Sequence, residues 1–361
     1  MYSRCASLLV LLLCLVILAG CEATAQEAIE ETPEVSTNSA TATDTTSASY
    51  ISTRRILDTR ATLLNEGLIR DSSGVVSSAP CAQHEELIFN APSPPLCEEI
   101  TIESLGVTYR AFLFSQSHDV LVIYHEGHMG CAVPGVLAEN VLPDANDLIS
   151  LILQRADVLY LDMPLLATNC GQKIHVNGTT YSGMLHSWFA LLDKPGESAL
   201  AYFFNHIHSA LDYLGPRYRT IHMTGRSGGG WAATIYAALD WRITRSVSVA
   251  GSLPIELRTP DLDGVDDLGD WEQYGPHIFR LLSYQALYEA AGGMFEPRRH
   301  VLIYNEFDNC CFSGVKGVTA GEQYVSSSEG FNRERVAFLV NRGEWEHAIP
   351  AEMVVEQLFG P

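Results

Sequence analysis

The chain has few basic residues. It contains 22 Lys and Arg against 43 Asp and Glu, which gives a formal net charge of −21 at pH 7. A surface of this sign repels nucleic acid and anionic lipid, so nucleic acid is not an expected partner. Hydrophobic residues make up 47% of the sequence, which is enough for a sizeable core over most of its length.

Long hydrophobic runs are also missing. The apolar stretch near the start, residues 8–17, follows Arg4 and is too short to span a bilayer, so it predicts an export signal. It leads into residues 18–21 (Leu-Ala-Gly-Cys), which resemble the lipobox of bacterial lipoproteins. The resemblance implies that Cys21 is lipidated and anchors the exported protein to a bacterial membrane in the cell envelope. The alternative is an ordinary secretory signal in which Cys21 has no role.

Large apolar residues are scarce in the next segment. Residues 22–50 are rich in Ser, Thr, Ala and Glu, and cannot bury enough surface to fold. They therefore predict a flexible tether. The sequence divides into a signal peptide at 1–20, a tether at 21–50 and one folded domain at 51–361.

No C-x2-C pair occurs among the nine cysteines, so their spacing does not resemble a zinc finger or zinc ribbon. Without the two cysteines of the signal segment and Cys21, an even number remains. In an exported chain this predicts disulfides. The remaining cysteines are Cys81, Cys97, Cys131, Cys170, Cys310 and Cys311.

Two pairings are expected. Cys131 and Cys170 each follow a predicted parallel strand at the same edge of the sheet, so their loops are expected to meet. Cys81 with Cys97 is a second plausible pair. The state of the adjacent cysteines at 310–311 stays open, because a bond between neighbours closes a strained ring.

The pattern of apolar residues indicates an α/β fold. Residues 101–104 and 107–115 alternate around a turn, which predicts a hairpin. Further strands are expected at 119–124, 158–161, 220–223, 246–250, 300–304 and 335–339. Helices are expected at 146–155, 199–214, 231–239, 278–291 and 350–358. This order predicts a mostly parallel central sheet with helices on both faces. Residues 165–197 fit no simple connection, and we expect them to form a small lid.

A nucleophile motif lies between a predicted strand and a predicted helix. Residues 225–229 (Gly-Arg-Ser-Gly-Gly) form a G-x-S-x-G pentapeptide. A sharp strand-to-helix turn lifts the serine hydroxyl above the sheet, and only glycine tolerates the crowding beside it. The motif predicts Ser227 as a nucleophile. The N–H of Gly228 is the first expected donor to an oxyanion.

An activated serine needs a base and an orienting carboxylate. His347 is the only histidine after residue 308, and it lies between the last strand and the last helix. Asp308 and Glu306 both follow the strand at 300–304. We favour Asp308 as the acid, because it lies further into the loop where the imidazole is expected.

A second oxyanion donor is expected after the strand at 119–124. The candidates are the backbone N–H groups of Gly127 and His128, and the sequence does not choose between them. His125 and His128 are three residues apart after a strand, so they do not match the H-E-x-x-H zinc motif of a helix. The acidic residues of 261–270 lack full EF-hand spacing, and a solvated loop is favoured over a calcium site. No metal and no cofactor are expected.

Together, His125-x-Gly127 after a strand, the pentapeptide around Ser227, Asp308 and His347 resemble the α/β-hydrolase superfamily over residues 100–358. The resemblance implies an eight-strand-type sheet and acyl transfer through a Ser-His-Asp triad and an acyl-enzyme. We expect an esterase-like serine hydrolase acting on a small-molecule or polymer-borne carboxylic ester. A peptidase of the same fold and an inactive, surface-tethered binding lipoprotein are the alternatives.

Overall fold

The computed structural model describes most of the chain from residue 43 onward. The described residues are 43–70, 74–81, 94–131, 142–176, 178–182, 186–258, 269–312, 322 and 334–360. The predicted signal peptide, Cys21, most of the predicted tether and most of the acidic loop at 261–270 lie outside them. No helix in the described ranges is long and apolar enough to cross a membrane.

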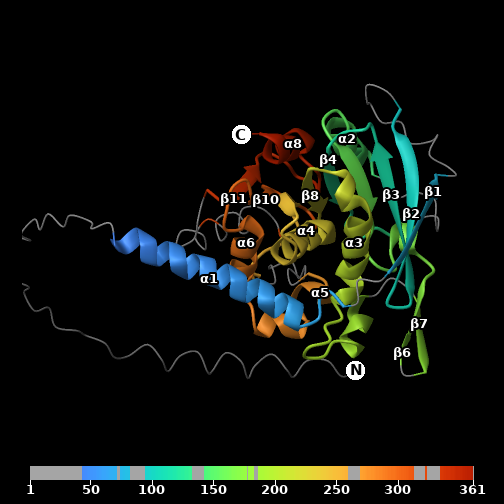
Figure 1. Ribbon diagram of the computed structural model, residues 1–361, viewed down its shortest axis with the longest axis horizontal. Coiled ribbons are helices and arrows are strands. Elements are labelled where there is room, and N and C mark those ends of the chain that lie inside the picture. Colours follow the sequence, from blue (N-terminus) through green and yellow to red (C-terminus); the bar gives the residue numbers. More distant parts are fainter. Residues whose placement is uncertain are drawn as a thin grey trace, which may run out of the picture. The chain divides into compact units, whose positions relative to one another are not determined.

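A nine-stranded sheet runs through the centre of the fold in the order β1-β2-β3-β5-β4-β8-β9-β10-β11 (Figure 1). Its strands are β1 (Val75–Pro80), β2 (Leu96–Ser104), β3 (Val107–Ser115), β4 (Val120–His125), β5 (Asp157–Leu161), β8 (Thr220–Arg226), β9 (Ile243–Val249), β10 (Arg299–Asn305) and β11 (Val336–Asn341). The ladders from β1 to β5 are antiparallel, and the ladders from β5 to β11 are parallel. The predicted mostly parallel sheet is confirmed, with β1 as an additional edge strand.

Helices cover both faces of this sheet (Figure 1). They are α1 (Thr43–Asn65), α2 (Pro143–Ile152), α3 (Ala201–Leu214), α4 (Gly228–Leu239), α5 (Trp271–Tyr274), α6 (Tyr284–Gly292) and α8 (Ala351–Phe359). Buried residues of α3, α4 and α6 pack in one hydrophobic cluster, and those of α2 and α8 pack in a second. The predicted helices on both faces are confirmed.

The local structure follows the sequence pattern closely at the hairpin. Leu105 and Gly106 join β2 to β3 with φ values of 52° and 76°. Two positive φ values in a two-residue connection match the twist of an antiparallel pair. Every residue of β5 is buried, as a strand covered by helices on both faces requires. The predicted hairpin is therefore confirmed, together with the buried strands that follow it.

The expected helix at 278–291 is wrong in one respect. The structure divides it into a 3₁₀ turn at His277–Arg280 and α6. Ser283 separates them, because its hydroxyl accepts a hydrogen bond from the N–H of Ala286 and caps the start of α6. Helix α1 was not predicted. It begins at Thr43, within the last residues of the predicted tether.

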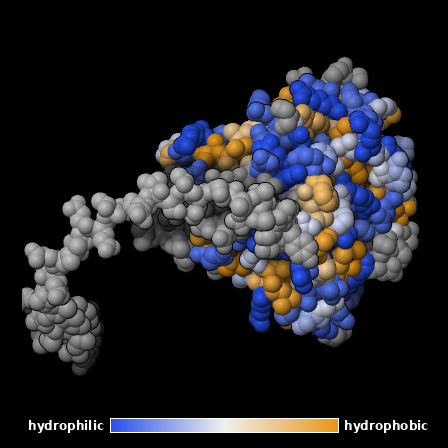
Figure 2. Space-filling model, turned by 60° about the vertical axis from the view of Figure 1, so that its left-hand side comes forward, coloured by the Kyte–Doolittle hydropathy of each residue, from blue (hydrophilic) through white to orange (hydrophobic). Residues whose placement is uncertain are grey.

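Large apolar side chains reach the surface singly. On the face drawn in Figure 2, hydrophobic residues are interspersed among hydrophilic ones. The most exposed in the described ranges include Leu96, Phe295 and Trp345, which come from distant parts of the chain. Isolated exposed apolar residues are normal on folded domains, so exposure alone does not indicate a functional site.

Three disulfides occur among the described residues. Cys81 pairs with Cys97 and Cys131 with Cys170, with Cα–Cα distances of 5.4 and 5.8 Å. Both expected pairings are confirmed. The adjacent residues Cys310 and Cys311, whose state the sequence left open, are bonded to each other. The bond from Cys131 ties the segment after β4 to the segment after β5.

Loss of the Cys131–Cys170 bond should destabilise the protein. Its partners are 39 residues apart, and a cross-link closing a loop of that length contributes about 4 kcal/mol through the unfolded chain. A Cys131→Ala/Cys170→Ala variant should lose roughly that much free energy of unfolding in urea titrations. The matched Cys81→Ala/Cys97→Ala variant closes a shorter loop and should lose about 3 kcal/mol. A loss below about 1 kcal/mol for the first pair would contradict this account.

Candidate active site

The segment around Ser227 forms a tight elbow between β8 and α4. Ser227 has φ 55° and ψ −127°, a conformation that L-residues rarely adopt. Its N–H donates to the carbonyl of Val249 at 2.8 Å, which fixes the turn against β9. A side chain at Gly229 would collide with the backbone of His125 and Glu126. Glycine is therefore required where the elbow meets the end of β4.

Asp308 and His347 form a hydrogen-bonded pair. Asp308 follows β10, and His347 lies between β11 and α8. The Nδ1 atom of His347 is 2.8 Å from Oδ2 of Asp308. The Nε2 atom of the same ring is buried and has no hydrogen-bond partner among the described residues. The ring is thus held through one nitrogen while the other remains available.

The side chain of Glu306, the other candidate for the acid, binds different residues. Glu306 accepts a hydrogen bond from the N–H of Gly343 at 2.9 Å and lies 3.7 Å from Nη1 of Arg342. No contact joins it to His347 in the described part of the chain. Of the two carboxylates that the sequence offered, the structure brings Asp308 to the imidazole.

The vicinal cysteines orient Asp308. Its Oδ1 atom accepts hydrogen bonds from the N–H groups of Cys310 and Cys311 at 2.9 and 3.0 Å. Burial alone would raise the pKa of Asp308, but the hydrogen bond and charge of His347, with these N–H groups, outweigh it and lower the pKa. Asp308 therefore remains ionised and directed at His347.

The two candidate oxyanion donors differ in what they already bind. Gly127 lies against the elbow, and a side chain there would come within 2.8 Å of the Cβ atom of Ser227. Its N–H, however, donates to Oε1 of Glu126 at 2.8 Å. In the described ranges no hydrogen bond uses the N–H of His128, whose ring packs against Gly228. Of the two candidates, the N–H of His128 is therefore the one with no acceptor in the described ranges.

A buried ion-pair network that the sequence did not indicate joins these segments. Arg226, next to the nucleophile, donates to Oε1 of Glu126 and to Oδ2 of Asp144, both at 2.9 Å. The other oxygen of Glu126 accepts from the hydroxyl of Tyr124. Asp144 also accepts from the N–H of Ile349, two residues after His347, at 3.0 Å. One guanidinium thus connects the elbow, the segment after β4, α2 and the histidine loop.

A second polar cluster lies beside the elbow. It consists of His128, His186 and Glu272, whose ligand atoms all lie within 4.8 Å of one another. His186 begins a 3₁₀ turn at His186–Leu191, in the segment expected to form a lid. The same segment contains a small hairpin, β6 (Lys173–Val176) with β7 (Thr179–Ser182). No short motif links the three residues, so sequence reasoning missed the cluster.

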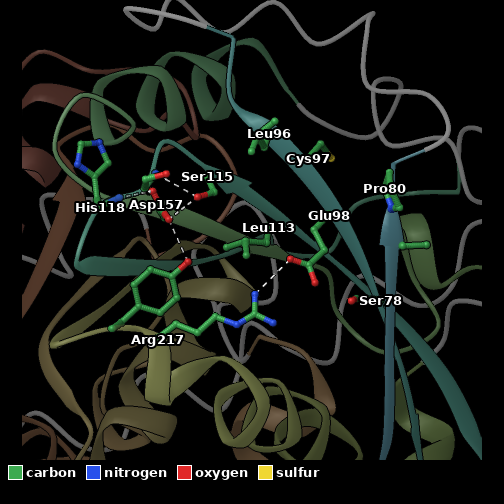
Figure 3. A pocket seen from close by; sticks show the side chains of 13 residues that line it. Ser78, Pro80, Leu96, Cys97, Glu98, Leu113, Ser115, His118, Asp157 and Arg217 are labelled. Atoms are coloured by element: carbon green, nitrogen blue, oxygen red, sulfur yellow. Dashed lines mark hydrogen bonds and ion pairs between the residues drawn. The ribbon is translucent and has the colours of Figure 1, made fainter.

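The large surface hollow in Figure 3 is lined by none of the residues Ser227, Asp308 and His347. It has a volume of about 590 Å³ and is bordered by Leu96, Glu98, Arg217 and Asp157. Asp157 begins β5, so the hollow lies at the amino ends of the parallel strands. The carboxylate of Asp157 already accepts hydrogen bonds from Ser115, Gln116, His118 and Tyr218. These satisfied contacts indicate structural polarity rather than a reactive site.

Comparisons with known proteins identify the fold. No protein-family model matches the chain, and no curated protein matches it in sequence. Methylesterase BT1017 has a similar structure, with TM-score 0.54 and 16% identity over 88% of this chain and 64% of that one. A Glucuronoyl Esterase from Solibacter usitatus is similar with TM-score 0.51 and 15% identity, over 85% of this chain and 91% of that one. The chain spans less than two thirds of the methylesterase. This chain has the α/β-hydrolase fold.

Removing the central guanidinium should destabilise the fold. An Arg226→Met variant leaves the buried carboxylate of Glu126 without its only charged partner among the described residues, and such a loss costs roughly 3–5 kcal/mol of unfolding free energy. Arg219→Met, which breaks an exposed pair with Asp119, should change stability little. Denaturant titration of both variants gives the comparison. Equal stability of the two variants would show that the buried network does not hold the segments together.

Proposed function

We propose that the protein is a serine hydrolase that cleaves carboxylic esters, with Ser227 as nucleophile, His347 as base and Asp308 as acid. The observation that supports it most is the Asp308–His347 pair with a free Nε2 atom. It follows β10 and β11 at the same sheet edge where Ser227 follows β8. In parallel sheets this carboxyl edge is where ligands bind.

The proposed reaction has two steps. The Nε2 atom of His347 takes the proton of the Ser227 hydroxyl while the oxygen attacks the acyl carbon. The N–H groups of Gly228 and His128 hold the oxyanion, and Asp308 stabilises the imidazolium. His347 then gives its proton to the departing alcohol, which leaves an acyl-enzyme. Water attacks this ester while His347 takes its proton, and His347 then gives that proton to the Ser227 oxygen as the carboxylic acid leaves.

An ester carried on a polymer is the proposed substrate. The names of the structurally similar esterases, a methylesterase and a glucuronoyl esterase, support ester hydrolysis. Phe307 comes directly before Asp308, and Trp345 lies two residues before His347. Their rings stack with centroids 4.2 Å apart, and Trp345 is 66% exposed. An exposed aromatic face beside the reacting groups suits a ring of a saccharide chain.

The triad gives the first functional test. Ser227→Ala should abolish hydrolysis of short-chain aryl esters, and His347→Ala should nearly do so, because the hydroxyl has no base. Asp308→Asn should lower kcat on the order of 10⁴-fold, because the imidazole takes the wrong tautomer. Glu306→Gln is the matched control and should retain most activity. The measurement is steady-state kinetics of the purified full chain.

Three results would contradict this assignment. Undiminished hydrolysis by a folded Ser227→Ala protein would remove Ser227 as nucleophile. An inactive wild type would instead favour the binding-lipoprotein alternative, and faster cleavage of amides than of esters would favour the peptidase.

The stacked pair of Phe307 and Trp345 gives a separate test of substrate class. Trp345→Ala should raise KM for an acetylated polysaccharide by about 2- to 10-fold, which corresponds to one lost aromatic contact. KM for a small aryl acetate should rise less. Phe295→Ala removes an equally exposed aromatic at the opposite end of β10 and serves as the control. If both variants change KM for the polymer equally, Trp345 has no specific role in binding it.

We also propose, from residues 18–21, that the mature chain begins at lipidated Cys21 and is anchored to a membrane of the cell envelope. Several acyl chains on one cysteine give firm anchoring at about 0.8 kcal/mol per buried methylene. Mass spectrometry of the protein from the membrane fraction should find acylated Cys21 at the amino terminus. An intact Cys21 thiol, or cleavage at another residue, would refute the anchor.

A further inference from the structure

We infer that His128, His186 and Glu272 bind a divalent transition-metal ion such as Zn²⁺. The three residues come from separate parts of the fold: the segment after β4, the 3₁₀ turn at His186–Leu191, and α5. The site goes beyond the proposed function, and its occupancy can be measured without any hydrolysis assay.

The spacing of the ligand atoms fits one metal ion. The Nε2 atom of His128 is 3.0 Å from Nδ1 of His186 and 2.7 Å from Oε1 of Glu272. The Nδ1 atom of His186 is 3.4 Å from Oε2 of Glu272. Zinc bonds of about 2.0–2.2 Å in tetrahedral geometry separate neighbouring ligand atoms by roughly 3.3 Å. Only small side-chain movements would place these three atoms around an ion, and a water molecule would take the fourth tetrahedral position.

The ring nitrogen of each histidine that faces away from the cluster lies near an oxygen that can accept its proton. The Nε2 atom of His186 is 2.9 Å from the carbonyl oxygen of Pro164, and this contact requires a proton on that nitrogen. The Nδ1 atom of His128 is 3.2 Å from Oδ2 of Asp270. With protons on these outer nitrogens, the lone pairs of both rings point into the cluster. Metal-bound histidines usually donate their second N–H to a carboxylate or carbonyl in this manner.

The cluster needs positive charge at its centre. Glu272 is completely buried, and neither of its oxygens accepts a well-aligned hydrogen bond from the described residues. A buried carboxylate facing two lone pairs is unfavourable unless a cation lies between them. A bound metal ion or a proton on one imidazole meets this need. Two nitrogens and a carboxylate suit zinc, whereas calcium and magnesium prefer oxygen shells.

The ion would hold the segment that carries the proposed oxyanion donor. The ring of His128 packs against Gly228 at the elbow, and its backbone N–H is the proposed second donor. Binding through Nε2 would tie this residue to the lid segment and to α5. The disulfide from Cys131 joins the same two segments, the one after β4 and the lid, by a covalent route. The proposed role of the metal is therefore positioning rather than chemistry.

Zinc binding to the full chain tests the site. After treatment with a chelator, the wild type should bind one Zn²⁺ per chain in calorimetry, and Co²⁺ in its place should show the visible absorption of a tetrahedral site. Glu272→Gln and His186→Gln should weaken zinc binding by roughly 100-fold or more, and Asp270→Asn by roughly 10-fold. His277→Gln removes a histidine 3.3 Å from Glu66 and should bind zinc as the wild type does.

Several outcomes would overturn the inference. A wild type that binds no zinc after chelator treatment would mean that the cluster holds a proton instead. Binding that is unchanged in the Glu272 and His186 variants would place the ion elsewhere. Because Asp270 is about half exposed, its variant should fold even if the buried variants do not. Unchanged affinity in Asp270→Asn would then count against the site.

Discussion

The site depends on the buried guanidinium of Arg226. It bonds two carboxylates, Glu126 after β4 and Asp144 at the start of α2, and Asp144 also holds the N–H of Ile349 in the histidine loop. Two buried charges are costly unless they are paired and hydrogen-bonded. The network therefore fixes the relative positions of three loops that the sheet alone leaves free. Its neighbour Ser227 can keep a strained backbone only because this surrounding is rigid.

Two residues of the proposed triad, Ser227 and Asp308, are fixed by contacts outside the triad. The elbow is closed by the Ser227 N–H bond to Val249 and by glycines that accommodate the backbone of β4. Asp308 is oriented by the N–H groups of the bonded pair Cys310 and Cys311. The segment that carries Cys170 and His186 is tied to the segment after β4 by a disulfide and by the histidine–carboxylate cluster. These ties preorganise the site before a substrate arrives.

The sequence predicted features whose signal is local. The hairpin at Leu105, the elbow around Ser227 and the order of the buried strands all depend on residues close together in the chain. It did not predict the break at Ser283, although a serine cap is itself a local signal. Nor could it predict the pairing of Arg226 with Glu126, which are 100 residues apart, or the approach of His186 to Glu272. Such contacts arise only when the sheet brings distant loops together.

The proposed mechanism requires Ser227 to be an activated nucleophile. The most direct measurement is labelling of the full chain with a fluorophosphonate probe, followed by peptide mapping of the modified residue. We expect one labelled site, Ser227, and loss of labelling in His347→Ala, because the free Nε2 atom must take the serine proton. Labelling of another residue, or no labelling of the folded wild type, would contradict it.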